Sequence, residues 1–283
     1  MDAEIKDIYN SSLFSVHNFL CRCTTCSVSA REHSNRLSVV YIRKGNFQFK
    51  VFRNDLDVYH GLFMVNKPGH EYRVGHVHDL PDECTIFSIA EERLGLIEEQ
   101  TTAYRWFFDN PDLKTMLIPA TPGTEYLHHH IFGLLHTPRV PRLWVDSLIS
   151  ELLTRVLATA GGKLLQNELT EKQKRHYLPG VEAVKEFIHA NFTEDLSLSQ
   201  LAEICHLSPF HFTRLFSKIT TSTPYQYMLK VRLEQARLQL LHTSLPVTEI
   251  AFSSGFNSLE HFSAAFKKIY GCSPAAAKKS NFS

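Results

Sequence analysis

Residues Ser199–Ile219 constrain the fold of this chain most strongly, because they predict two short amphipathic helices separated by one tight corner. The apolar residues of the two helices recur on one face of each: Leu201, Ala202 and Ile204, with Leu207 at the corner, then Phe212, Leu215, Phe216 and Ile219. Ser208 followed by Pro209 marks the start of the second helix, since a serine hydroxyl accepts hydrogen bonds from free N–H groups and proline fits the first helical position. The outer face of this helix is aromatic, polar and basic, which suits a DNA major groove.

The same pattern occurs again fifty positions later, with one extra residue at the corner. Six residues of the first copy recur in the second: His211, Phe212, Phe216, Lys218, Ile219 and Pro224 return as His261, Phe262, Phe266, Lys268, Ile269 and Pro274. A long helix is predicted between the copies, from about Pro224 to His242. Twenty helical residues span about 30 Å, close to the ~34 Å between successive major-groove faces. One chain is therefore expected to place both second helices on one side of a duplex.

Length and composition exclude several other classes of protein. A chain of 283 residues favours two domains, and its formal net charge of +1 neither requires nor excludes a nucleic-acid partner. No apolar run approaches the roughly 18 to 20 residues of a membrane span, and the polar N-terminus lacks a signal-peptide pattern. We therefore expect a cytoplasmic protein. Six cysteines are few for this length, so we expect reduced thiols rather than a disulfide framework.

The first hundred residues have β-type patterning. Apolar and polar residues alternate around Phe47, Phe49 and Val51, and Lys44-Gly45-Asn46 separates this run from the strand-like run that starts near Leu37, which predicts a hairpin. Further short strands are expected near residues 61–66, 72–76 and 84–90. Strands of this spacing predict a small antiparallel barrel or sandwich.

Helical patterning is expected over about residues 90–160, interrupted by turn signals near residues 109–111 and 119–123. It includes an apolar stripe at helical spacing: Leu148, Ile149, Leu152, Leu153, Val156 and Leu157. This stripe fits either packing on the chain's own barrel or pairing with a second copy in a dimer. Residues 171–180 have almost no apolar content and end in Pro-Gly, which predicts a linker. The expected domains are therefore 1–170 and 181–283, separated by that linker.

The last hundred residues resemble the DNA-binding domain of AraC/XylS-type transcription regulators. The matching motifs are Leu201-Ala202, Leu207-Ser208-Pro209, Arg214-Leu215-Phe216, Arg232-Leu233 with Ala236, Ile250-Ala251, Gly255-Phe256, Phe262, Phe266-Lys267-Lys268 and Ser273-Pro274. The chain departs from the family where Thr221 replaces a usual glycine, where Ala264 stands in place of a frequent arginine, and after Ser273-Pro274. The resemblance implies an α+β protein: a cupin-like antiparallel β-barrel with flanking helices serves as a sensor and dimerisation domain, followed by an all-α domain in which a long helix joins two helix-turn-helix motifs.

The resemblance also implies which side chains contact DNA. Six residues occupy base-reading positions: Phe210, Thr213 and Arg214 in the first helix, and Leu259, Glu260 and Ser263 in the second. Arg214 suits a bidentate contact to guanine, although a phosphate clamp or a salt bridge is an alternative. Phe210 either contacts a thymine methyl or packs on a neighbouring helix. The second helix has little positive charge, so phosphate and shape contacts are expected there.

Four further residues are expected at DNA phosphates: Ser208, Lys218, Lys267 and Lys268. For each lysine, a solvated surface charge is the alternative interpretation.

Two sets of residues in the N-terminal half suggest chemistry. Cys21, Cys23 and Cys26, with His33 nearby, form a thiol cluster that could chelate a soft metal or be oxidised, or could be unreactive, half-buried cysteines.

The second set is a candidate sensor or ligand pocket made of His70, His76, His78, Glu83 and Cys84. His76-x-His78 with Glu83 resembles the first metal motif of cupin enzymes. The glycine spacings do not fit, and Pro68-Gly69-His70, which resembles the second motif, precedes the first. The pattern from Gly75 to Cys84 also resembles a strand pair of non-enzymatic sensor domains, which favours a structural role for the histidines.

These features predict a sequence-specific transcription regulator that responds to a small molecule or a stress signal. We predict no catalytic residues, no metal and no cofactor, since no nucleophile, base and orienting group form a recognisable set. The expected partners are double-stranded DNA, a small-molecule effector, a second copy of the chain bound through the N-terminal domain, and RNA polymerase. Two alternatives stay open: a metal-dependent cupin enzyme fused to a DNA-binding tail, and a thiol-based redox sensor.

Overall fold

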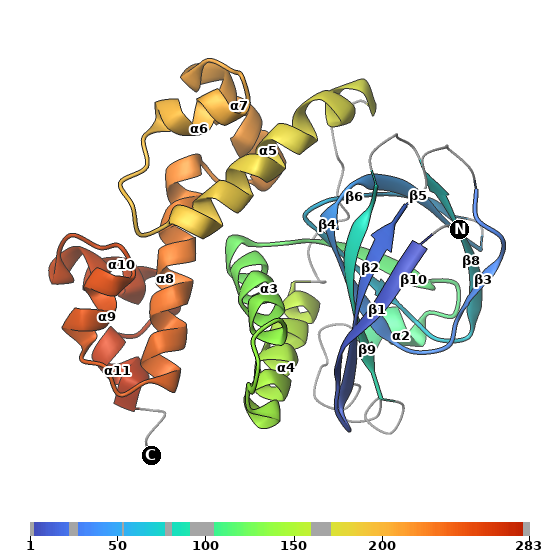
Figure 1. Ribbon diagram of the computed structural model, residues 1–283, viewed down its shortest axis with the longest axis horizontal. Coiled ribbons are helices and arrows are strands. Elements are labelled where there is room, and N and C mark those ends of the chain that lie inside the picture. The colour runs from blue at the N-terminus through green and yellow to red at the C-terminus, as the bar shows by residue number, and fades with distance from the viewer. Residues whose placement is uncertain are drawn as a thin grey trace. The chain divides into compact units, whose positions relative to one another are not determined.

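The computed structural model describes residues 3–22, 28–52, 54–76, 81–90, 105–159 and 171–279. The chain divides into two compact units, Met1–Ala120 with Leu127–Glu171 and Thr121–Tyr126 with Lys172–Ser283. All the described strands lie in the first unit, and the described elements that follow residue 171 are helices, which confirms the α+β class (Figure 1). Among the described residues, no helix is long and apolar enough to cross a membrane.

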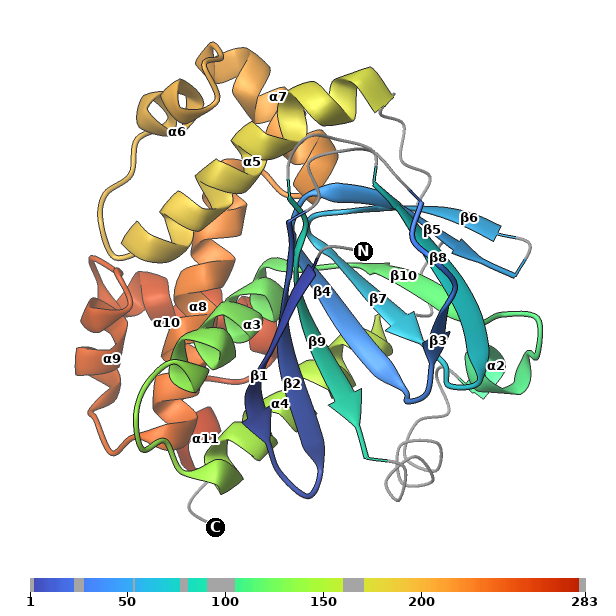
Figure 2. The same cartoon turned by 45° about the vertical axis from the view of Figure 1, so that its right-hand side comes forward.

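Two antiparallel sheets form the N-terminal unit (Figure 2). The strands are β1 Ala3–Asn10, β2 Phe14–Cys21, β3 Glu32–Ser34, β4 Ser38–Lys44, β5 Asn46–Val51, β6 Asn54–Tyr59, β7 Leu62–Asn66, β8 His70–His76, β9 Glu83–Ile89 and β10 Thr115–Pro119. One sheet has the order β1-β2-β9-β4-β7-β10, and the other has the order β3-β8-β5-β6. The strands predicted near residues 61–66, 72–76 and 84–90 are therefore present.

The core of this unit lies between the two sheets. Alternation in β5 turns Phe47, Phe49 and Val51 inward, where they pack with Val40 and Ile42 of β4. The central strand β4 is covered on its other face as well: the Tyr41 ring lies 4.2 Å from the ring of His128. Cover on both faces explains why β4 has a continuous apolar run instead of alternation.

The predicted hairpin between β4 and β5 is wrong, because the two strands belong to different sheets. Lys44-Gly45-Asn46 is the corner at which the chain passes from one sheet to the other. Gly45 has a φ of 92°, and the carboxylate of Asp82 accepts a hydrogen bond of 3.0 Å from the N–H of Asn46. The hairpin instead joins β5 to β6, with Val51 opposite Asn54.

The region expected to be helical from about 90 to 160 contains a strand. β10 pairs with β7 at the edge of the larger sheet, from Thr115 opposite Asn66 to Pro119 opposite Leu62. A proline is tolerated at such an edge because its missing N–H breaks no ladder bond. The helices described in this part are α2 Arg105–Asp109, α3 Pro122–Leu135 and α4 Arg142–Ala158.

The apolar stripe of α4 is buried within the single chain. All six predicted residues are 3% exposed or less. These six side chains are therefore not exposed for pairing with a second copy. The buried residue His128 of α3 forms a 2.9 Å hydrogen bond between its Nε2 and the Thr85 hydroxyl, so α3 is also fixed to β9.

The helical unit consists of α5 Glu171–Asn191, α6 Leu198–Ile204, α7 Pro209–Thr220, α8 Pro224–His242, α9 Val247–Ser253, α10 Leu259–Tyr270 and α11 Pro274–Lys279. The residues expected to form a linker, 171–180, lie within α5. Glu, Lys, Gln and Arg are good helix formers even without an apolar face, and Pro179 remains inside the helix. Gly180 lets α5 pass close to the corner after α6, since a Cβ there would lie 3.2 Å from the Cys205 Sγ.

A buried polar network fixes the first turn of α3 within the helical unit. Glu125 is 2% exposed, forms an ion pair with Lys185 of α5 and accepts a hydrogen bond from the Tyr227 hydroxyl of α8. The Tyr227 hydroxyl also lies 2.9 Å from the Nε2 of His189. A buried carboxylate needs partners of this kind, because an unpaired charge in the interior is strongly destabilising.

Substitution of Gly45 by Ala should destabilise the N-terminal unit by about 3 kcal/mol. The left-handed φ costs a side chain about 1 to 2 kcal/mol, and a Cβ would lie 2.1 Å from the Asp82 Oδ1, so the hydrogen bond to Asn46 must also break. Gly69→Ala is the control, because Gly69 has a φ of 79° and nothing within 4 Å of its Cβ position. Urea unfolding should show a loss of only about 1 kcal/mol for the control. Equal losses would contradict the role of Asp82.

Candidate functional site

The first helix-turn-helix is made by α6, the corner and α7. Ser197 and Gln200 form a capping box at the start of α6. The chain then turns through His206, which has a φ of 53°, and the N–H of Leu207 donates to the carbonyl of Ala202 over 3.1 Å. This αL residue after a helix is a common helix ending. It closes α6 within a few residues of the next helix.

The second helix, α7, begins as predicted. The Ser208 hydroxyl accepts a hydrogen bond of 3.3 Å from the N–H of His211, and Pro209 occupies the first helical position. Because Ser208 already caps the helix, its hydroxyl is oriented toward the backbone of α7. The first turn of α7 is exposed, as a groove-facing helix start requires.

The second helix-turn-helix repeats this geometry in α9 and α10. Gly255 takes the αL conformation with a φ of 84°, and the N–H of Phe256 donates to the Ala251 carbonyl over 3.1 Å. Ser258 caps α10 by accepting from the N–H of His261 over 3.2 Å. The extra corner residue, Asn257, is exposed. Both motifs end in a helix of 12 residues, and the predicted duplication is therefore present in the backbone.

The two motifs lie at opposite ends of α8 (Figure 1). This helix has 19 residues, which corresponds to about 28 Å. Its bounds are those predicted, and Thr223 with Gln226 forms a capping box at its start. The second helices of the two motifs, α7 and α10, are called the reading helices below. Their apolar faces are buried, with Phe212 and Phe216 of α7 and Phe262 and Phe266 of α10 fully inaccessible to solvent. Burial of these faces leaves the opposite faces of α7 and α10 for a ligand.

The outer face of α7 presents the side chains expected to read bases. Phe210 is 81% exposed, so it does not pack on a neighbouring helix. Arg214 is exposed, and the described part of the chain gives it no acidic partner. Thr213 is half-buried and donates its hydroxyl hydrogen to the Pro209 carbonyl over 2.8 Å. Lys218, in the last turn of α7, is exposed.

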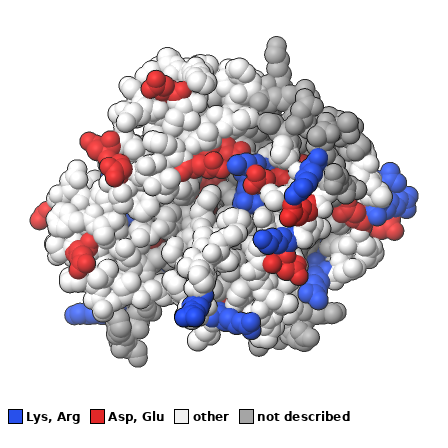
Figure 3. All heavy atoms as spheres, viewed as in Figure 1, with Lys and Arg blue, Asp and Glu red and all other residues white. Residues whose placement is uncertain are grey.

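The outer face of α10 differs in character. Glu260 is exposed, Ser263 is half-buried, and Leu259 packs against the apolar cluster that contains Phe262 and Phe266. Lys267 and Lys268 are exposed near the end of the helix. On the face drawn in Figure 3, the charges over the helical unit are mostly acidic and separated, so that face offers little attraction to phosphates.

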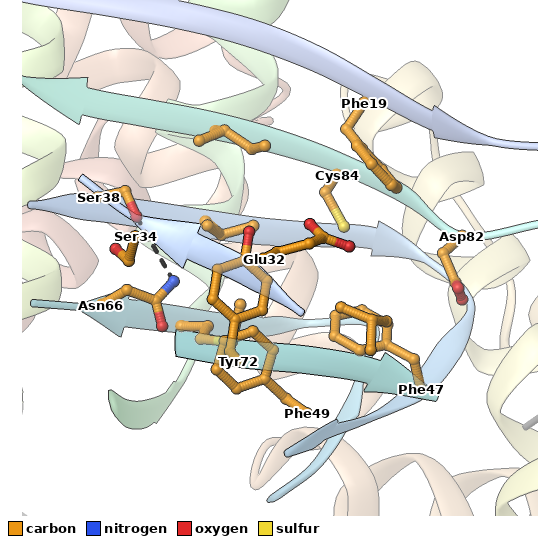
Figure 4. A pocket seen from close by; sticks show the side chains of 14 residues that line it. Phe19, Glu32, Ser34, Ser38, Phe47, Phe49, Asn66, Tyr72, Asp82 and Cys84 are labelled. Atoms are coloured by element: carbon orange, nitrogen blue, oxygen red, sulfur yellow. Dashed lines mark hydrogen bonds between the residues drawn. The ribbon is translucent and has the colours of Figure 1, made fainter. Parts of the chain in front are cut away.

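The N-terminal unit contains a cavity of about 130 Å³ between its two sheets (Figure 4). Its walls come from seven strands and from Asp82, which precedes β9, and most of the lining residues are apolar. Sequence reasoning missed the cavity residues Glu32, Tyr72 and Asp82. Part of the signal was present in the sequence: Asp82 belongs to the Gly75–Cys84 pattern, and Tyr72 and Val74 share one face of β8, with Arg73 between them on the other.

The structure does not bring the five predicted pocket residues to one place. Cys84 lines the cavity, whereas Glu83 forms an ion pair of 3.2 Å with Arg43. His70 is buried and lines a separate hollow with Lys114, and its burial lowers its pKa, which favours the neutral imidazole. The side chain of His76 and the whole of His78 lie outside the described residues.

Two of the cysteines are buried within the sheets. Cys21 ends β2 and is 2% exposed, and Cys84 is 4% exposed. Burial raises the pKa of the Cys84 thiol, so the reactive thiolate is disfavoured. Cys23 and Cys26 lie outside the described residues, and His33 is exposed on β3. Within the described ranges, no three His, Cys, Asp or Glu residues are grouped as a metal site would need.

Comparison with known proteins places the chain in a family. Residues 201–280 match the family model described as a helix-turn-helix domain. The chain is 30% identical over 132 residues to XylDLEGF operon transcriptional activator 2 of Pseudomonas putida, a match that covers 46% of this chain and 84% of that protein. The chain therefore belongs to the AraC/XylS-type transcription regulators.

Other matches cover smaller shares of the relatives. The chain is 40% identical over 95 residues to the bifunctional transcriptional activator/DNA repair enzyme AdaA of Bacillus subtilis, and this match covers 34% of this chain but only 45% of AdaA. Among solved structures, unsaturated fatty acid bound ToxT from Vibrio cholerae strain SCE256 is 11% identical, with a TM-score of 0.42, over 95% of this chain and 96% of that chain.

The ends of the two reading helices provide a test of their backbone equivalence. Thr221 ends α7 with a φ of 57°, and Gly271 ends α10 with a φ of 78°. A β-branched residue is strained in this conformation, so Thr221→Gly should stabilise the helical unit by about 1 kcal/mol. The reverse change, Gly271→Thr, should destabilise it by a similar amount, since nothing lies within 4 Å of a Cβ there. Thermal unfolding of both variants measures the difference, and a destabilised Thr221→Gly variant would contradict the assignment.

Proposed function

We propose that this protein is a sequence-specific DNA-binding regulator that inserts α7 and α10 into successive major grooves on one side of its operator. The observation that supports this most directly is the repeated geometry: two capped 12-residue helices with exposed outer faces, joined by α8. The length of α8, about 28 Å, approaches the ~34 Å repeat of the duplex.

The two helices are proposed to contribute differently. In α7, Arg214 and Phe210 are exposed, and we assign them to a guanine and a thymine methyl, respectively. Thr213 lies on the same helix face. In α10, the corresponding residues are Glu260, Ser263 and Ala264, which add no positive charge. We assign α10 and Leu259 mainly to shape, and Lys218, Lys267, Lys268 and the α7 terminus at Ser208 to phosphates.

The N-terminal unit is proposed to be the sensor, with a small-molecule effector in the cavity between the sheets. Membership of the family supports a homodimer formed through this unit, contact with RNA polymerase, and a cytoplasmic location. No catalytic role is proposed, because the relatives are mostly transcription regulators. AdaA is named as a DNA repair enzyme as well as an activator, but its match with this chain covers only 95 residues, 45% of AdaA.

Selection of binding sites from random duplex DNA by the full chain tests the function. We expect an enriched site with two conserved segments about one helical turn apart, since α7 and α10 occupy successive grooves. The segment read by α7 should show the sharper base preference. Binding without any enriched sequence would overturn the proposal of a sequence-specific regulator.

Arg214→Ala should weaken binding to the selected site by about 1 to 3 kcal/mol and relax one base position. Arg214→Lys should keep the phosphate attraction but lose the bidentate fork, so base preference should still relax. Lys268→Ala is the matched control, since it removes a proposed phosphate contact. It should weaken binding equally for all sequences and reduce the slope of log affinity against log salt by about 1. Mobility-shift titrations on matched and mutated sites measure both effects. An unchanged base preference in Arg214→Ala would show that Arg214 contacts the DNA phosphates and not a base.

A further inference from the structure

The cavity of the N-terminal unit has a size that limits its ligand. Its volume is about 130 Å³, and an apolar protein cavity of about 150 Å³ accommodates one benzene molecule. A ligand group of about six to eight non-hydrogen atoms therefore fills the cavity.

Aromatic rings form much of the cavity wall. Phe47 and Phe49 of β5 and Tyr72 of β8 lie along one wall, and Phe19 of β2 lies across from them (Figure 4). The rings of Phe49 and Tyr72 are stacked, with centroids 4.8 Å apart. Aromatic faces carry negative partial charge, so a wall of this kind attracts cations as well as apolar groups.

A carboxylate projects into this aromatic cavity. Glu32 of β3 lies directly opposite Tyr72 in the strand register, so both side chains point to the same side of the sheet. Figure 4 shows the Glu32 side chain extending into the cavity. Burial raises the pKa of the Tyr72 hydroxyl, and the neighbouring charge of Glu32 raises it further. Tyr72 therefore stays neutral, and the carboxylate oxygens of Glu32 are acceptors for a ligand.

The other charged side chain of the lining is also acidic. Asp82 is 2% exposed, and its Oδ1 already accepts the Asn46 N–H. No Lys, Arg or His is among the described residues that line the cavity. Arg43, whose charge lies near Cys84, is paired with Glu83, which does not line the cavity. An anionic ligand would thus lose its hydration and meet two carboxylates without a compensating cation.

We propose that this cavity binds a small organic cation, an alkyl- or arylammonium ion whose charge lies against Glu32 and the aromatic wall. The proposal rests on the assignment of the N-terminal unit as the effector sensor and specifies the chemical class of the effector. The carboxylate balances the charge of the ammonium group, and the rings replace its hydration shell. Neutral and anionic molecules of the same shape lack both interactions.

Three probes of nearly equal shape test the charge requirement by calorimetric titration of the full chain: choline, 3,3-dimethyl-1-butanol as its neutral isostere, and 3,3-dimethylbutyrate as its anionic counterpart. Choline should bind at least about tenfold more tightly than the alcohol, and the anion should not bind. Equal or tighter binding of the alcohol, binding of the anion, or no binding of choline at millimolar concentration would overturn the proposal.

Two variants locate the interaction. Glu32→Gln keeps the shape of the side chain and should remove the preference for choline over the alcohol. Glu71→Gln is the matched control, since Glu71 lies on β8 beside Tyr72, is exposed and pairs with Arg31; it should bind like the unmodified chain. Phe49→Leu should weaken choline binding more than alcohol binding. A choline preference that survives in Glu32→Gln would overturn the proposal.

Operator binding by the same preparations separates this proposal from the function on which it rests. Sequence-specific binding to DNA in all variants, together with a failure of choline to bind, would reject only the ligand class. Loss of sequence specificity in the unmodified chain would reject the regulator itself, whatever the cavity binds.

Discussion

The N-terminal unit depends on the buried residue Asp82. The side-chain Oδ1 of Asp82 accepts a hydrogen bond from the N–H of Asn46, and its backbone carbonyl accepts one of 2.8 Å from the N–H of Cys21. Asp82, which directly precedes β9, therefore connects the end of β2 to the corner between β4 and β5. Because a buried charge without a hydrogen bond is costly, the corner at Gly45 has little freedom to move. This fixed corner sets the register in which Phe47 and Phe49 face the cavity.

In the helical unit, backbone geometry is repeated while surface chemistry is not. The hydrogen bonds of Leu207 to Ala202 and of Phe256 to Ala251 are equivalent and equal in length. The αL position between the helices is filled by His206 in one motif and by Gly255 in the other. Gly255 is required by close packing, since a Cβ there would lie 2.9 Å from the Arg232 Nε. The scaffold therefore tolerates divergence on the outer faces of α7 and α10 while the corners stay alike.

The helical unit was more predictable from sequence than the sheets, for a physical reason. Helix caps such as Ser208 and apolar spacings such as Phe212 to Phe216 act within a few residues, so the sequence specifies them locally. Alternation around Phe47 and Phe49 indicates a strand and its buried face, but it does not specify the neighbouring strand.

The corner that separates β4 from β5 depends on Asp82, which is 36 residues from Asn46 in the chain. The strands β1, β2, β3, β6 and β10 were missed: β1 and β6 are polar, β3 and β10 are short, and β2 lacks strict alternation of apolar and polar residues. The same limit applied to the candidate sites. The exposed faces of α7 and α10 followed from helical periodicity, whereas the cavity joins residues from seven strands and could not be assembled from local patterns.

Electrostatics limits how the helical unit can select DNA. From residue 181 onward the chain has ten Lys and Arg residues against eight Asp and Glu, and Arg237 is already paired with the buried Glu234. If Lys218, Lys267 and Lys268 neutralise phosphates, the slope of log affinity against log salt is about −2.7. A fourfold rise in salt then weakens binding roughly 40-fold, much less than for proteins with ten phosphate contacts. A weak electrostatic term gives little affinity for random sequence, so discrimination must come from contacts such as that of Arg214 and from occupation of two sites by a dimer.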